Sequence, residues 1–316
     1  MKKRKKLKIS TKNKSYSLND SPFFMLKSKK KLATLLGITI SDLSLLKKDD
    51  ENYSIFEQLS KKGKPRKIQK PLDALDIVHT RIASLLSRIA LPEYLHSGKK
   101  GRSNITNAHA HLNTSKTMTS DIKAFFPSTT RHMIFSFYFS VMKMSSDVAD
   151  VLSHICTCYG QLPTGSRISM PLAFFANSRM FDELNALCNT LKVKMTVYVD
   201  DLTFSGDNVN RLFCSVVRRI IYKHGHIMHP TKTKLYSEYM PKLVTGVIVT
   251  AGCMKVRNEQ HRLMARDIEY WMLIKDADRA RETSVVKTLF GRLHSMGVIE
   301  PRYKSKVLTL KMNTAI

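Results

Sequence analysis

The chain has 316 residues, 43% of them apolar, which is enough to bury a sizeable core in one large domain or two modest ones. Lys and Arg number 53 against 25 Asp and Glu, so the formal charge is +28 and a polyanionic partner is expected. No apolar run approaches the roughly 18 residues of a membrane span, and no signal-peptide pattern opens the chain. These features argue against a membrane partner and favour a cytoplasmic protein.

Cysteine and histidine spacing predicts neither a disulfide framework nor a zinc ribbon. The cysteines are odd in number and lack CxxC spacing, so we interpret them as reduced structural residues. His224, His226 and His229 precede Pro230 and form either a basic turn or part of a metal site. No second cluster completes a tetrahedral site, so the basic turn is the simpler interpretation. The cysteines are Cys156, Cys158, Cys188, Cys214 and Cys253.

The amino-terminal segment, residues 1–27, is predicted to be a basic arm. Its first 15 residues are too repulsive for an independent core element and are typical of an arm that orders on nucleic acid. A solvated tail is the alternative. The charges belong to Lys2, Lys3, Arg4, Lys5, Lys6, Lys8, Lys12 and Lys14.

Residues 30–46 carry leucines at helical spacing on both sides of Gly37, which predicts two short helices with a tight turn. Ser41 is placed to cap the second helix. The same outline suits a DNA-binding helix-turn-helix, although it is also common in helical packing.

The next segments predict a basic hairpin, a helix and a basic loop. Gly63 and Pro65 mark a turn within residues 61–71, and the apolar residues of 73–89 recur on one helical face. Residues 98–104 form the second basic loop.

Short β-type runs then alternate with helical runs, which predicts an α+β domain whose antiparallel sheet is backed by helices. From residue 254 the chain is helical in period and basic. The β-type runs are 118–122, 196–204 and 242–250, and the helical runs are 131–143, 146–158, 170–191 and 208–224.

Two carboxylate elements predict a metal site. Asp200 and Asp201 interrupt a β-type run, where ionised acids are costly to bury without cations, and a tight hairpin presenting both to a metal resolves that conflict. Asp121 ends an earlier β-type run. Carboxylates from different strands that hold two Mg²⁺ ions suit phosphoryl transfer in a polymerase. An ordinary Asp-Asp turn and a helix N-cap at Asp121 are the alternatives.

The order of these elements resembles motifs A, B and C of the reverse transcriptase palm: DxxxFF at 121–126, LPTGSRISMPLA at 162–173 and YVDD at 198–201. Two further segments resemble the retron branch of that family, namely NAHAH at 107–111 and VTG at 244–246. The helical lead over 30–46 also looks like that of retron enzymes, and the resemblance covers roughly residues 28 to 300.

The resemblance implies a right-hand polymerase with fingers, antiparallel-sheet palm and helical thumb. Residues 28–253 would form fingers and palm, and 254–316 the thumb. Asp121, Asp200 and Asp201 would be catalytic and hold two Mg²⁺ ions. Phe126 would exclude a 2′-hydroxyl from the nucleotide site, while Phe125 serves the core. The residues implied to bind the nucleotide are Thr164, Gly165, Lys99, Arg102 and Lys232. Further fingers cations would be Lys100, Arg66 and Lys67. The residues implied to contact RNA are Asn107, His111, Val244, Thr245 and Gly246.

Motif B departs from the family pattern at four positions. Thr164 stands where Gln is usual, Arg167 and Met170 where Pro is usual, and Phe174 where Asn is usual. Gly165 still permits close backbone approach to the incoming nucleotide. We expect activity to survive, with the contact to the templating base most affected.

The implied activity is RNA-directed DNA synthesis from dNTPs, in which a cognate noncoding RNA is copied into RNA-linked DNA. Family members prime from the 2′-hydroxyl of a guanosine, and the complex serves antiphage defence with an effector protein. An intron-maturase-like reverse transcriptase is one alternative. A non-catalytic RNA-binding scaffold that restrains an effector is another.

Overall fold

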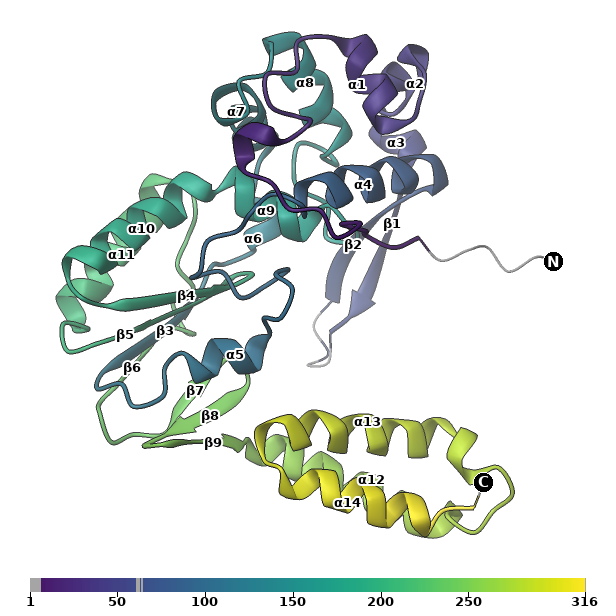
Figure 1. Ribbon diagram of the computed structural model, residues 1–316, viewed down its shortest axis with the longest axis vertical. Coiled ribbons are helices and arrows are strands. Elements are labelled where there is room, and N and C mark those ends of the chain that lie inside the picture. The colour runs from purple at the N-terminus through teal and green to yellow at the C-terminus, as the bar shows by residue number, and fades with distance from the viewer. Residues whose placement is uncertain (1–6, 61–62, 64, 316) are drawn as a thin grey trace.

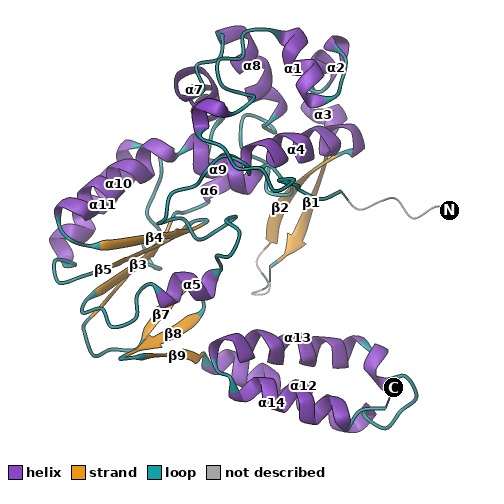
Figure 2. Ribbon diagram, in the orientation of Figure 1, coloured by secondary structure: helices purple, strands orange, loops and turns teal. Residues whose placement is uncertain are grey.

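The structure is a computed structural model that describes residues 7–60, 63 and 65–315. In this part of the chain, helices gather in an upper lobe, a four-stranded sheet with two long helices lies beside it, and a helical bundle ends the chain (Figure 1). Figure 2 shows a separate two-stranded hairpin below the upper lobe. All strand pairs within the sheets are antiparallel, so the prediction of an α+β fold with antiparallel sheets is confirmed.

The upper lobe surrounds the largest hydrophobic core. Its helix α4 buries Leu75, Val78 and Ile82 on one face, as the helical period predicts, and ends at Leu86. The lobe helices are α1 (Lys29–Leu36), α2 (Ile40–Leu45), α3 (Asp49–Asn52), α4 (Asp73–Leu86), α6 (Phe125–Ser128), α7 (Arg131–Ser136), α8 (Ser146–Ile155) and α9 (Ser169–Ala176).

The two helices predicted over residues 30–46 are present as α1 and α2. Gly37 ends α1 with φ of 76°, a left-handed conformation that glycine adopts without strain. The prediction that Ser41 caps α2 is wrong, because Thr39 is the N-cap and forms a reciprocal capping box with Asp42. α2 has no basic side chain, which argues against a DNA-reading role.

The amino-terminal segment is packed along α4. Tyr16 exchanges backbone hydrogen bonds with Arg88 and Ala90, and its hydroxyl donates to the Leu85 carbonyl at 2.8 Å. Phe23 is fully buried against Tyr138. From Tyr16 onward the segment is therefore docked on the lobe, whereas the basic residues within 1–6 lie outside the described residues.

The four-stranded sheet has the order β4-β5-β3-β6, and α10 and α11 lie along it (Figure 1). The polymerase motifs border its central strands, because β3 ends at Asp121, the first residue of motif A, and the β4–β5 hairpin contains YVDD. The elements are β3 (Thr117–Asp121), β4 (Lys194–Tyr198), β5 (Asp201–Ser205), β6 (Lys234–Tyr236), α10 (Ser178–Thr190) and α11 (Arg211–Lys223).

Two smaller sheets complete the strands. The hairpin of β1 (Tyr53–Leu59) and β2 (Pro65–Pro71) confirms the predicted basic hairpin, and nearly all of its β1 side chains are exposed. The second sheet packs against α5 (Asn104–His109). Its strands are β7 (Lys242–Val244), β8 (Val247–Thr250) and β9 (Cys253–Val256).

The carboxy-terminal helices form a bundle with a hydrophobic core of its own. The helical segment begins at Asn258 and not at 254, because residues 253–256 pair with β8 in the small sheet. The helices are α12 (Asn258–Ile274), α13 (Ser284–Ile299) and α14 (Arg302–Met312).

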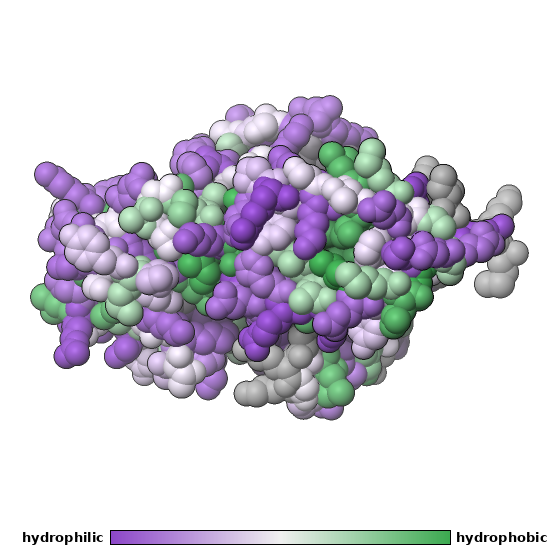
Figure 3. Space-filling view, turned by 90° about the horizontal axis from the view of Figure 1, so that it is seen from below, coloured by the Kyte–Doolittle hydropathy of each residue, from purple (hydrophilic) through white to green (hydrophobic). Residues whose placement is uncertain are grey.

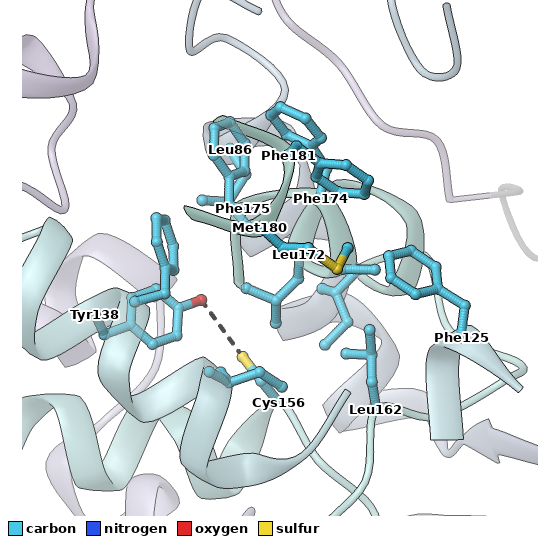
Figure 4. Close-up of a cluster of buried hydrophobic side chains, with 14 of the residues drawn as sticks. Leu86, Phe125, Tyr138, Cys156, Leu162, Leu172, Phe174, Phe175, Met180 and Phe181 are labelled. Carbon is cyan, nitrogen blue, oxygen red and sulfur yellow. Dashed lines mark hydrogen bonds between the residues drawn. The ribbon is translucent and has the colours of Figure 1, made fainter. Parts of the chain in front are cut away.

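Aromatic and sulfur side chains fill the core between the upper lobe and the sheet (Figure 4). Phe174 stacks on Phe181 with ring centroids 5.5 Å apart, so the residue that replaces the usual Asn is a core residue here. The Tyr138 hydroxyl lies 3.7 Å from the Cys156 sulfur. Burial raises the pKa of Cys156 to about 12, and Cys158, Cys188 and Cys214 are also buried, whereas Cys253 is exposed.

The molecular surface is mainly hydrophilic on the face shown in Figure 3, with scattered apolar patches. Among the described residues, no helix combines the length and the apolar character needed to cross a membrane.

We expect the substitution Phe23→Ala to lower the free energy of unfolding by about 3–5 kcal/mol, because it leaves a cavity in a packed core. Urea denaturation followed by circular dichroism measures this change. The control is Tyr239→Ala, which truncates an aromatic ring that is 88% exposed and should change stability by less than about 0.5 kcal/mol. Equal stabilities for the two variants would show that the amino-terminal segment is not docked.

Candidate metal and nucleotide site

Three carboxylates meet at one edge of the four-stranded sheet, where β3 ends and where the chain turns from β4 into β5. Asp121 is the last residue of β3 and pairs directly with Asp201, the first residue of β5. Asp200 occupies the two-residue turn between β4 and β5. One oxygen from each of these three carboxylates lies within 4.8 Å of the others.

The turn that carries Asp200 is held under backbone strain. Val199 has φ of 60°, a left-handed conformation that is rare for β-branched side chains and costs on the order of 1–3 kcal/mol. The Val199 N–H donates to the Ser97 hydroxyl at 3.0 Å, and the Ile122 N–H donates to the Asp200 carbonyl at 2.9 Å. These contacts fix the turn above the end of β3.

Burial and mutual repulsion disfavour the charged forms of the YVDD carboxylates. Burial raises the pKa of Asp201 to about 7, helped by the neighbouring Asp200 and Asp121. Burial also raises the pKa of Asp200, again helped by Asp121, while Lys232 and Arg66 oppose the shift. The Lys232 ammonium lies 2.8 Å from an Asp121 oxygen. The cluster is therefore short of positive charge.

The donor set fits a hard divalent cation. Three carboxylates supply only oxygen ligands, which Mg²⁺ prefers, and a bound cation would relieve their repulsion. This cluster is the single group of three or more metal-ligating side chains found among the described residues. Mg²⁺ itself and the number of ions stay predictions.

The histidines at 224–229 do not form a metal site. The His226 ring is buried between Ser128 and Asn177, and His224 lies 2.8 Å from a Glu183 oxygen. Their side chains thus bond to different partners, so the basic-turn interpretation is retained for this segment.

A polar pocket extends from the carboxylates to the β7–β8 turn. It is lined by Asp121, Asp201 and Lys232 on one side and by Thr245 and Gly246 on the other. The structure therefore brings predicted metal, nucleotide and RNA residues to one pocket. Val244, by contrast, is fully buried.

The β7–β8 turn is also strained and is held by α5. Thr245 has φ of 42°, and its hydroxyl donates to the Asn104 carbonyl at 2.8 Å. The Asn104 amide donates back to the Thr245 carbonyl at 3.2 Å. Asn104 and Ser97 were not singled out from the sequence, since residues so distant from their partners give no local signal.

Asn107 and His111 are buried, so the prediction that they contact RNA directly is not supported by this structure. The His111 ring bridges the hydroxyls of Ser205 and Thr196 at 2.6 and 2.7 Å, and burial lowers its pKa to about 3. The neutral ring ties the segment that follows α5 to β4 and β5 of the four-stranded sheet.

Lys99 and Arg102 do not line the carboxylate pocket. Both bond to Glu93, and the Lys99 ammonium also donates to the carbonyls of Leu91 and Pro92. The prediction that they neutralise a triphosphate in this arrangement is therefore not supported. The positive charge of Arg66 in β2 opposes the rise in the pKa of Asp200.

Of the remaining residues predicted to bind the nucleotide, Phe126 lies beside Phe125, whereas Thr164 and Gly165 contact the β1–β2 hairpin. Phe126 is half-buried beside the buried Phe125, with ring centroids 6.0 Å apart, five residues after Asp121. The Thr164 hydroxyl donates to the Lys67 carbonyl, so that hydrogen is not available to a nucleotide. Gly165 approaches the hairpin closely, since an added Cβ would lie 2.8 Å from the backbone oxygen of Gln69.

Sequence comparison identifies relatives of the chain, although no family model matches it. The chain is 28% identical over 245 residues to the retron Se72 reverse transcriptase of Salmonella heidelberg, which covers 73% of this chain and 64% of that protein. It is 23% identical over 227 residues to the retron Ec86 enzyme of Escherichia coli, covering 70% of each chain. The chain is a relative of retron reverse transcriptases. The resemblance seen in its motifs is thereby confirmed.

The likeness to retron reverse transcriptases extends to the Mx162 enzyme of Myxococcus xanthus, at 25% identity over 262 residues that cover 72% of this chain and 54% of that protein. This chain thus spans less than two thirds of the length of the Se72 and Mx162 enzymes. A solved foamy viral protease-reverse transcriptase in complex with double-stranded DNA aligns with 83% of this chain and 38% of its own, at a TM-score of 0.49 and 15% identity.

We expect Asp201→Asn to stabilise the metal-free protein at pH 8 by on the order of 1–3 kcal/mol, since one pKa unit corresponds to about 1.4 kcal/mol. The native pKa of Asp201, about 7, exceeds the unfolded value, so wild-type stability falls as pH rises toward 7. The advantage of the variant should disappear near pH 4. Denaturation in EDTA across pH 4 to 8 measures it.

The control is Asp278→Asn, at an exposed position between α12 and α13, which should show no such pH dependence. Added Mg²⁺ should raise the melting temperature of the wild type more than that of Asp201→Asn. A variant less stable than the wild type in EDTA at pH 8 would contradict the repulsion described above.

Proposed function

We propose that this protein is an RNA-directed DNA polymerase that acts in the cytoplasm. The observation that carries the proposal is the meeting of Asp121, Asp200 and Asp201 at one strand edge, in a relative of retron reverse transcriptases. Two Mg²⁺ ions held there would activate a primer hydroxyl and stabilise the departing pyrophosphate. The carboxylates are rigidly placed because β3, β4 and β5 are paired in one sheet.

Other residues of the pocket are assigned by their position. Lys232 is bonded to Asp121, but its side chain is 56% exposed, so its ammonium has room to turn toward a pyrophosphate. Phe126 is proposed to face the deoxyribose. Thr245 and Gly246 form the opposite wall, where primer or RNA backbone would pass.

The division into a right hand follows the arrangement of helices and sheets, in which the upper lobe and the four-stranded sheet share one hydrophobic core and the carboxy-terminal bundle has its own. The upper lobe with its β1–β2 hairpin would be the fingers, the four-stranded sheet with α10 and α11 the palm, and α12–α14 the thumb. The separate core of the bundle supports a thumb that moves as a unit. In residue terms, fingers and palm would occupy 28–253 and the thumb 254–316, after an arm of residues 1–27.

The retron relatives support a more specific product. We infer that the protein copies a cognate noncoding RNA into RNA-linked single-stranded DNA (msDNA), with dNTPs as substrates. The charge of +28 suits a protein that holds RNA and its DNA copy together. We also infer that the protein acts in antiphage defence together with an effector protein.

The double substitution Asp200→Asn, Asp201→Asn should abolish dNTP incorporation on an RNA template, by at least about 10³-fold, because it removes metal-binding charge without removing volume. Incorporation of labelled dTTP on a primed poly(rA) template measures the loss. Retained RNA binding and an unchanged circular dichroism spectrum would show that the protein still folds. Full activity in the double variant would contradict the polymerase proposal and leave the RNA-binding scaffold as the better interpretation.

The adjacent rings of Phe125 and Phe126 provide a matched pair for the sugar gate. Phe126→Ala should raise the ratio of rNTP to dNTP incorporation, because it opens space beside the 2′ position. Phe125→Ala should cost about 3–5 kcal/mol of stability and leave that ratio unchanged, because its ring is a core residue. The assignment of the gate is wrong if Phe126→Ala destabilises the protein with the sugar preference intact.

A further inference from the structure

The loop of residues 163–167 lies against the free edge of the β1–β2 hairpin. β2 pairs with β1 on one side, and its other edge presents the Lys67 carbonyl and the Gln69 N–H and carbonyl. Thr164 and Gly165 form hydrogen bonds with these backbone groups. The Thr164 hydroxyl donates to the Lys67 carbonyl at 2.8 Å and accepts from the Gln69 N–H at 3.4 Å, and the Gly165 N–H donates to the Gln69 carbonyl at 3.2 Å.

The contact is close enough to restrict the loop sequence. A Cβ added to Gly165 would lie 2.8 Å from the Gln69 oxygen and 3.0 Å from a methyl of Ile68. Gly165 does not have a positive φ, so the need for glycine comes from this approach and not from backbone conformation. Hairpin and loop are thus complementary at this edge.

The same loop is anchored from behind to α4. Ser166 lies 2.7 Å from His79, whose other ring nitrogen donates to the Ile155 carbonyl at 2.8 Å, so the Ser166 hydroxyl is the donor. Arg167 forms an ion pair with Asp76. Because α4 belongs to the main core, the loop is a fixed point from which the hairpin can be held.

The hairpin has few other attachments along its length. Every β1 residue after Tyr53 is exposed, and the Tyr53 hydroxyl bonds to the Thr157 carbonyl at the base of the hairpin. Arg66 lies one residue before Lys67, whose carbonyl accepts the hydrogen bond from Thr164. The position of the Arg66 side chain therefore depends on how β2 is held.

We propose that Thr164 is a positioning residue whose hydroxyl holds β2 in place, so that the neighbouring Arg66 is positioned for an incoming nucleoside triphosphate. The inference rests on the proposed polymerase function. It assigns Thr164 to the hairpin backbone, and the triphosphate contact to Arg66.

The matched variants are Thr164→Val, which keeps the shape and removes the hydroxyl, and Thr164→Ser, which keeps the hydroxyl. In the protein alone, amide exchange of residues 66–70 should accelerate in Thr164→Val and return toward the wild-type rate in Thr164→Ser. In steady-state dTTP incorporation on primed poly(rA), Thr164→Val should raise KM by about 3- to 10-fold, the effect of one ordinary hydrogen bond, with kcat little changed.

A double-mutant cycle tests whether Thr164 acts through Arg66. If it does, Arg66→Ala raises KM and adding Thr164→Val raises it little further. Effects on KM that multiply would overturn the proposal, as would unchanged amide exchange in Thr164→Val. A lower melting temperature with unchanged KM would reduce Thr164 to a structural role. An inactive wild-type protein would overturn the proposed function, while the exchange rates would still decide whether Thr164 holds β2.

Discussion

Repulsion among three carboxylates is the constraint on which the site depends. Asp121, Asp200 and Asp201 have oxygens within 4.8 Å of one another in a partly buried setting, where each disfavours the charge of the others. Such a cluster persists only when rigid backbone holds it and cations approach it. Strand pairing supplies the first condition, and Lys232 and Arg66 supply part of the second.

The rigid backbone is itself held by polar contacts between distant segments. The Ser97 hydroxyl bonds to the strained Val199, and the Asn104 amide bonds to the strained Thr245. His111, just after α5, bridges the hydroxyls of Thr196 in β4 and Ser205 in β5. In each contact, one residue comes from the segment 97–111 and its partner from beyond residue 195. This segment therefore acts as a support for both turns that border the pocket, which gives the family element at 107–111 a structural meaning.

The sequence was sufficient to predict β2, β3, the β4–β5 hairpin, β7 and β8, the long helices and the carboxylate triad, because periodicity and the isolated acids of YVDD are local signals; it missed β1, β6 and β9. It was insufficient for Lys99 and Arg102, whose charges are directed to Glu93 by tertiary contacts. The same limit applies to the burial of Asn107 and to the docking of residues 16–27 along α4. A sequence pattern shows which groups are available, whereas the contacts made in the folded chain decide where they point.

The departures in motif B illustrate how such partners change the meaning of a pattern. Arg167, in place of a Pro that would preset the loop, is anchored by Asp76, and Phe174, in place of Asn, stacks on Phe181. Thr164 bonds to the hairpin backbone. A side chain that had lost its role would be expected to lack such partners, since an uncompensated buried change costs stability. The residues at these positions therefore have specific partners in this fold, and their departures from the family pattern are no sign of a decayed active site.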